Sequence, residues 1–385
     1  MPQRAAFPVG STVPRAAAAL AAAMMLSVCL LAASAGIARA QNAARTVMLV
    51  NEMEVYALGR DMELFEDPTG RLKIDQVAAP EFSHRFRPGG EDEPNFGLTR
   101  SAVWARVTLN SILAVHRDWF LVFREALVDR VTVYVPRPDG GWTALEGGML
   151  ASRSYFRLAH RYPVFPLWLQ PAEQPTLYVR VENRGTLTIP LVIQSVASLY
   201  ASDRSEQLLF GTLFGILMTV CVYLFFIWRV MRERCQLYLI LMQLSVTFYI
   251  ASANGFLAEY LWHGMPWWTG YSVPLSILMA MVTGILFADS FLAVRRHMPA
   301  FYRVLRLLVV ALASLAVLAA FDRLLVNRLL PWCVIGLVAV FLHAGVGAIR
   351  LKVDGGPVFL VAFSALLAGG LARSLVSLDL LPANL

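Results

Sequence analysis

The sequence has few charged residues and few cysteines, and both shortages restrict the class of protein. Only 15% of the 385 residues are charged and 58% are hydrophobic, with a mean hydropathy of +0.59. Soluble domains carry about a quarter charged residues, so a membrane protein is expected. Residues 41–206 contain none of the four cysteines. This segment therefore has neither a disulfide framework nor a cysteine-based metal site.

Motifs for catalysis and for nucleic-acid binding are lacking as well. There are no paired carboxylates, no glycine-rich phosphate loop and no serine–histidine–aspartate arrangement, so neither an enzyme nor a bound cofactor or metal is expected. The net charge is +7, but the arginines are scattered or adjoin apolar runs, without aromatic interleaving. We therefore expect no nucleic-acid partner and interpret the positive charge as a determinant of membrane topology. The broken helix pairs of transporters are not evident.

The first 40 residues have the features of a secretory signal peptide. Arg4 and Arg15 precede an alanine-rich apolar run at 16–33, and Ala38-Arg39-Ala40 fits an A-x-A cleavage site. An uncleaved anchor helix is the alternative interpretation. We expect a signal peptide at 1–40, an exported domain at 41–206 and a membrane domain at 207–385.

Short strand-like runs fill the exported segment. "AVWARVTLN" (102–110) and "TLYVRVE" (176–182) are rich in β-branched and aromatic residues, and turn sequences such as "PRPDGG" and "NRG" separate the runs. This spacing predicts an antiparallel β-sandwich of about 150 residues. The expected fold class is thus a multi-domain membrane protein, in which an all-β, jelly-roll-like extracytoplasmic sandwich precedes an α-helical transmembrane bundle.

Long apolar runs begin near residue 207, each long enough to cross the hydrocarbon core of a bilayer. Six are predicted, at about 208–228, 236–256, 272–293, 307–321, 329–349 and 357–377. The loops after the first, third and fifth runs contain nine lysines and arginines, and the two alternate loops contain two. By the positive-inside rule, the nine cations face the cytoplasm and the β-domain lies outside. Six crossings also place Leu385 outside.

Two strands carry candidate ligand contacts. Alternation along 102–110 places Trp104, Arg106 and Asn110 on one face, and alternation along 176–182 places Tyr178 and Arg180 on one face. An aromatic ring stacks on the C–H face of a sugar, and planar guanidinium groups bind its hydroxyls. These five residues are therefore predicted to bind a small molecule, with a carbohydrate as the candidate. The alternative is an ordinary polar outer face.

Several motifs follow one another in a characteristic order. The membrane part contains "GTLFGILMTVCVYLFFIW", "RERCQLYLI", "NGFLAEYLW" and "FLAVRRHMP", and the exported part contains "NFGLTRSAVWARVTLN", "VTVYVPRPDGGW", "RYPVFPLWL" and "TLYVRVENRG". In this order the motifs resemble the bacterial seven-transmembrane receptors with diverse intracellular signalling modules, the 7TMR-DISM family, and the exported part resembles the type-two extracellular domain of that family.

The resemblance implies a sensory receptor of the bacterial inner membrane, acting as a homodimer and relaying to a cytoplasmic kinase or cyclase module. Such receptors have a seventh helix before the output module, and "LLPANL" resembles the outer loop that precedes it, so a truncated chain is expected. A membrane-anchored binding or transport-accessory protein without signalling output is the alternative.

Overall fold

The computed structural model describes residues 46–50, 53–112, 118–151, 160–169, 173–262, 265–353 and 355–377. The predicted signal peptide and the residues after Ser377 lie outside this part of the chain. The described residues form two compact units. One contains the β-strands, the following chain as far as Cys221, and Ser245–Ser276; the other contains Val222–Leu244 and the residues from Ile277 onward.

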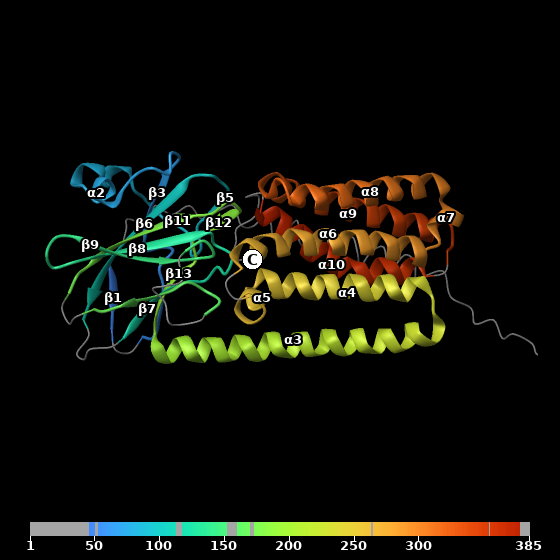
Figure 1. Ribbon diagram of the computed structural model, residues 1–385, viewed down its shortest axis with the longest axis horizontal. Helices are drawn as coiled ribbons and strands as arrows, with labels where there is room; N and C mark the ends of the chain where they lie inside the picture. The colour runs from blue at the N-terminus through green and yellow to red at the C-terminus, as the bar shows by residue number, and fades with distance from the viewer. Residues whose placement is uncertain are drawn as a thin grey trace, which may run out of the picture. The chain divides into compact units, whose positions relative to one another are not determined.

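The β-domain is built from two larger sheets and one small ribbon (Figure 1). The first sheet has the order β4-β3-β6-β11-β8-β9, with β1 paired to β6; its strands are β1 Val47–Leu49, β3 Glu63–Asp67, β4 Arg87–Pro88, β6 Ala102–Ser111, β8 Arg130–Pro136, β9 Trp142–Gly147 and β11 Thr176–Glu182. The second has the order β10-β7-β13-β2, comprising β2 Val55–Ala57, β7 Trp119–Phe123, β10 Val164–Leu167 and β13 Leu191–Ser195. The ribbon joins β5 Asn95–Leu98 to β12 Thr186–Thr188.

Period-two alternation builds the core of the domain. Val103, Val107 and Val179 are buried with Leu121 and Ile193 of the second sheet in one apolar cluster. Burial of this apolar surface is the main stabilising term for a domain without disulfides. The predicted β-sandwich is therefore confirmed. Of the pairs given for the described strands, β1 with β6 alone is parallel.

The outer face of the first sheet differs from the prediction. Helix α2 (Ile74–Val77; labelled in Figure 1) and the 3-10 helix η1 (Pro80–Arg85), which join β3 to β4, pack their apolar side chains on it. Val77, Phe86, Trp104 and Tyr178 form a second buried cluster there. Trp104 and Tyr178, which strand alternation places on this outer face, are therefore buried, and Trp104 is fully buried. The physical reason is that the connection between β3 and β4 supplies its own apolar side chains.

Asp67 stabilises the turn that follows β3 and leads to α2. The hydroxyl of Thr69 donates to Asp67 Oδ1 (2.6 Å), as does the Thr69 N–H (3.0 Å), and the Leu72 N–H donates to Oδ2 (3.1 Å). Burial by itself raises the pKa of Asp67, but these hydrogen bonds together hold the pKa below its ordinary value.

We expect Asp67→Ala to lower the free energy of unfolding by about 2–3 kcal/mol, because it removes the buried carboxylate that accepts hydrogen bonds from Thr69 and Leu72. Denaturant unfolding in detergent micelles measures the change. Asp139→Ala is the control, since Asp139 accepts a backbone N–H in an exposed turn and should change stability by under about 0.5 kcal/mol. Because the pKa of Asp67 is lower in the folded state, its carboxylate stabilises the fold at pH values above its unfolded pKa of about 4. This contribution is lost as the pH falls, so the stability of Asp67→Ala should decrease less on acidification than that of wild type.

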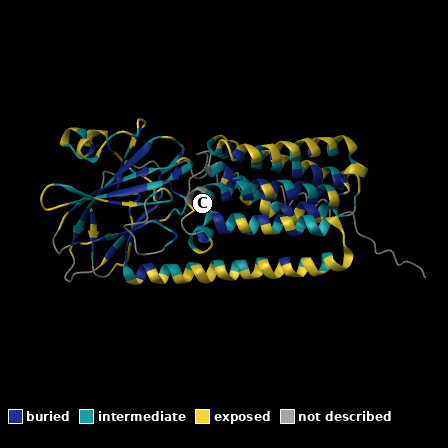
Figure 2. Cartoon of the chain, viewed as in Figure 1, coloured by how far each residue is buried: buried dark blue, intermediate teal, exposed yellow. Residues whose placement is uncertain are grey.

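Six helices in the described part of the chain are long and apolar enough to cross a membrane, which confirms the six predicted spans. They are α3 Val196–Met231, α4 Arg234–Ala253, α6 Pro266–Phe291, α8 Pro299–Ala319, α9 Arg323–Arg350 and α10 Gly356–Ser377. Short helices α5 (Phe256–Tyr260) and α7 (Val294–His297) lie between them. Helix α3 begins ten residues before position 206 and exposes most of its surface (Figure 2).

Candidate functional site

The predicted ligand residues lie on one sheet face, which we call the sheet-face cluster (Trp104, Arg106, Tyr178 and Arg180). The register of β6 and β11 pairs Trp104 with Arg180 and Arg106 with Tyr178, so the strands bring these four side chains together as predicted. The ring of Trp104 stacks on Tyr134 with centroids 5.6 Å apart. Asn110 is half-buried near the far end of β6, opposite Met48 of β1, and is not part of this cluster.

The two arginines of the cluster bind the segments that cover the sheet. Arg106 Nε donates to Glu63 Oε2 (2.7 Å) and Arg106 Nη1 donates to Ser83 Oγ of η1 (2.9 Å). Arg180 Nη2 donates to the carbonyl of Gly70 (2.7 Å) and forms an ion pair with Glu182 (2.8 Å). The two arginines therefore hold the connection that carries α2 and η1 on the sheet, through Gly70 before α2 and Ser83 in η1.

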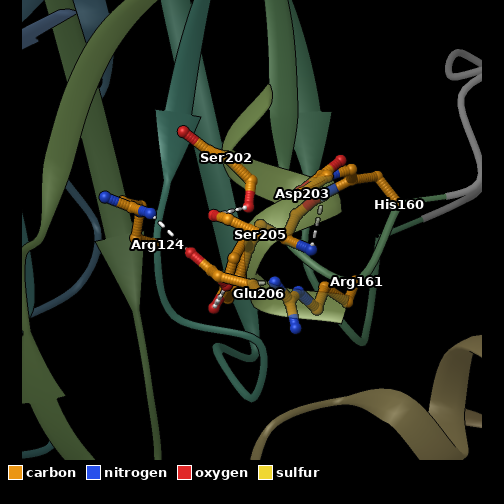
Figure 3. A network of polar contacts seen from close by, with 8 residues as sticks. Arg124, His160, Arg161, Ser202, Asp203, Ser205 and Glu206 are labelled. Atoms are coloured by element: carbon orange, nitrogen blue, oxygen red, sulfur yellow. Dashed lines mark hydrogen bonds and ion pairs between the residues drawn. The ribbon is translucent and has the colours of Figure 1, made fainter. Parts of the chain in front are cut away.

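A second polar group, which sequence reasoning did not identify, lies where α3 leaves the β-domain. We call it the helix junction; Figure 3 shows its residues, Arg124, His160, Arg161, Asp203 and Glu206. The Ser198 N–H donates to Ser195 Oγ (3.2 Å) at the start of α3, and Leu199 is buried against Val122 and Val164 of the second sheet. The first turns of α3 are thus part of the β-domain's packing.

Glu206 is the centre of the junction. Arg124 Nη2 donates to Glu206 Oε1 (2.6 Å), while Arg161 Nη2 and the Tyr162 hydroxyl donate to Oε2, the latter at 3.3 Å. Burial raises the pKa of Tyr162 to about 12, against the opposing effect of Arg161, so the hydroxyl keeps its proton and remains a donor at physiological pH. Two cations and one hydroxyl therefore converge on one carboxylate of α3.

Arg161 is the most enclosed of these charges, with a side chain only 3% exposed. Its guanidinium carbon lies 4.7 Å from the ring centroid of Tyr162 and 4.8 Å from that of Phe256 in α5. Phe256 in turn contacts Phe210 of α3, with ring centroids 5.0 Å apart. One arginine thereby joins the β-domain, α3 and the turn that leads into α5.

His160 adds a further link to α3. Its Nδ1 accepts the Tyr162 N–H (3.0 Å), so in the neutral ring the proton is on Nε2, which donates to Asp203 Oδ2 (2.7 Å). Asp203 and Glu206 are spaced three residues apart and lie on one helix face. That acidic spacing ahead of the first apolar span is a signal by which the sequence could have indicated the junction.

Gly255, which precedes α5, packs directly on the β-domain. Its φ is +78°, and a Cβ there would lie 2.7 Å from Cβ of Ala126 and 3.3 Å from Cβ of Arg161. We expect Gly255→Ala to destabilise this turn by more than the 1–2 kcal/mol that a left-handed conformation costs, because neither neighbouring Cβ is flexible.

Hydrogen exchange in the turn around each substituted glycine measures the effect, at residues 253–262 for Gly255→Ala. Gly140→Ala, measured in its own turn, is the control, since Gly140 has a φ of +85° and open space around the missing Cβ. Gly140→Ala therefore introduces the backbone strain of a left-handed alanine without a steric clash. Equal effects of the two substitutions would contradict the close packing at Gly255.

The fold defines a multi-pass membrane protein with an N-terminal β-sandwich domain. Comparison with protein families agrees. The family model described as "7TMR-DISM extracellular 2" matches residues 59–195, and "7TM diverse intracellular signalling" matches residues 206–385. The chain belongs to the 7TMR-DISM receptor family. No curated protein matches the chain.

Proposed function

We propose that the β-sandwich binds a periplasmic small molecule and that the helix junction passes the resulting change to the membrane helices. The observation that carries this proposal is the continuity of α3. The same helix is bound to the sandwich through Asp203 and Glu206 and then crosses the membrane. A ligand that prefers one arrangement of the sandwich therefore biases the position of α3.

The sheet-face cluster supports a ligand with hydroxyl groups, such as a carbohydrate. It combines aromatic rings with two arginines, which is the chemistry that binds sugars. Trp104 and Tyr178 are covered, so a ligand reaches them only when the α2–η1 segment moves. Arg106 and Arg180 hold that segment through Ser83 and Gly70, so a ligand that takes over their hydrogen bonds releases it.

The signal requires an output outside the described residues. We infer that the receptor acts as a homodimer with a cytoplasmic kinase or cyclase module as its signalling partner, in line with family membership. The alternative, a membrane-anchored binding or transport-accessory protein, shares the sandwich and its ligand but needs no movement of α3.

Hydrogen exchange on the full chain in nanodiscs separates these two functions. The probes are simple sugars and their acidic derivatives, first screened for a rise in melting temperature. For a sugar that binds, we expect altered exchange in residues 73–88 and in the first turns of α3, between Val196 and Phe210. Ligand binding with unchanged exchange in α3 would favour the accessory protein.

The variant Glu206→Gln tests whether the junction carries the change. It should bind the same sugar with unchanged affinity while the exchange response of α3 is lost, because a neutral amide holds Arg124 and Arg161 weakly. Glu91→Gln is the control, since Glu91 lies in an exposed turn of the β-domain. A response in Glu206→Gln equal to that of the control would contradict a role for the junction.

A further inference from the structure

A group of exposed arginines follows the third membrane span, on the cytoplasmic side. Arg295 and Arg296 lie in α7, and Arg303 and Arg306 lie in the first two turns of α8; all four are exposed. We call them the α7–α8 arginines. The Asp289 carboxylate interacts electrostatically with Arg295 and Arg306, but among the described residues none of the four has an ion-pair partner. The group thus carries a large excess of positive charge.

Packing within the helical unit holds this group in place. The ring of Phe301 lies 4.8 Å from His343 of α9, and Phe291 lies 6.2 Å from Phe359 of α10. Tyr302 lies between two of the arginines: Arg306 Nη1 donates to its hydroxyl (3.2 Å), and the guanidinium carbon of Arg295 is 5.9 Å from its ring. Tyrosine and arginine together are typical of the membrane–water interface.

The arginines stand at the end of an apolar stripe on α8. Arg303, Leu307, Val310 and Val317 recur at spacings of three, four and seven and so share a helix face. Leu307 is 70% exposed, Val310 62% and Val317 65%. In a bilayer, lipid acyl chains lie against such a face. A phospholipid whose chains follow the stripe has its phosphate at the level of Arg303 and Arg306.

We propose that the α7–α8 arginines and the α8 stripe form a binding surface for anionic phospholipids of the cytoplasmic leaflet. Guanidinium groups bind phosphate oxygens through paired hydrogen bonds, and an anionic headgroup adds negative charge beyond that of Asp289. The positive-inside rule accounts for cations on this side of the membrane. It does not account for four of them gathered where a lipid-facing stripe ends. Apolar side chains beside Arg303 and Arg306 favour a lipid over a soluble anion.

Native mass spectrometry on the full chain in neutral detergent tests the surface. The protein is offered an equimolar mixture of phosphatidylglycerol and phosphatidylcholine with identical acyl chains. The test variant is R295Q/R296Q/R303Q/R306Q. The control, R71Q/R87Q/R100Q/R184Q, removes four exposed arginines of the β-domain and so makes the same change in net charge.

Wild type and control are expected to retain phosphatidylglycerol preferentially, and the test variant to lose about tenfold or more of that preference, because each cation near an anionic surface contributes about a fivefold factor. The rise in melting temperature on adding phosphatidylglycerol should be lost in parallel, while the melting temperature in detergent alone stays unchanged. Equal retention of both lipids by wild type, or unchanged preference in the test variant, would overturn the proposal. Displacement of the lipid by excess glycerol 3-phosphate would instead assign a soluble-anion site and would also overturn it.

Discussion

Arg161→Ala should lower the free energy of unfolding of the helix junction by about 3–5 kcal/mol, because it leaves Glu206 without its enclosed counter-charge. The Glu206 side chain is only 25% exposed, so water cannot fully replace the guanidinium. The substitution also removes the cation that lies over Tyr162 and Phe256. We expect the first turns of α3 to open locally far more often than in wild type.

Hydrogen exchange over Val196–Phe210 of the full chain measures that opening. Arg124→Ala is the matched control, because Arg124 binds the same carboxylate from a more exposed position and should contribute about 1 kcal/mol or less. The double variant R161A/E206A should be less destabilised than the sum of its single variants, as expected for a coupled pair. An Arg161→Ala effect no larger than that of Arg124→Ala would contradict the assignment of Arg161 as the main link.

Trp104→Ala should lower the free energy of unfolding of the β-sandwich by about 3–5 kcal/mol, the range for removing a fully buried large side chain. The cavity would open between the sheet and the α2–η1 cover, where Tyr134 would lose its stacking partner. Denaturant or thermal unfolding in micelles measures this change. Trp168→Ala is the control, because Trp168 is exposed and its loss should change stability by about 0.5 kcal/mol or less.

Because Trp104 is buried, its substitution by alanine is a poor test of whether the sheet-face cluster binds a sugar. Loss of sugar affinity in Trp104→Ala would reflect a damaged core as readily as a lost contact. Trp104→Phe keeps an aromatic ring in the cluster, and Arg180→Gln changes the polar contact while the sheet core stays intact. A bound sugar whose affinity is unchanged in both variants would remove the sheet-face cluster from the hypothesis.

In the proposed function the two clusters have different tasks within one sandwich. The first sheet carries the candidate ligand residues beneath a short cover, and the second sheet carries the residues that hold α3. A single apolar core joins the two sheets. Close-packed interiors transmit displacement from one face to the other, which is the physical basis on which the proposed function links release of the cover to movement of α3.

The sequence by itself determined the class of protein, the six spans, their orientation and which strand residues share a face. These features depend on local quantities: hydropathy over about 20 residues, the distribution of cations between loops, and period-two alternation. The placement of Trp104, Arg106, Tyr178 and Arg180 on one face followed from that alternation. Family resemblance added the receptor class through motif order.

Only the tertiary structure decided what covers that face and what holds α3. Helix α2 and η1 are too short to give a periodic signal, so the burial of Trp104 could not be read from strand alternation. The helix junction joins residues near 124, 161 and 206, and Arg161 also contacts Phe256; these positions are far apart along the chain. Contacts of that kind depend on how the elements pack, and no local pattern specifies which distant partner a buried charge will find.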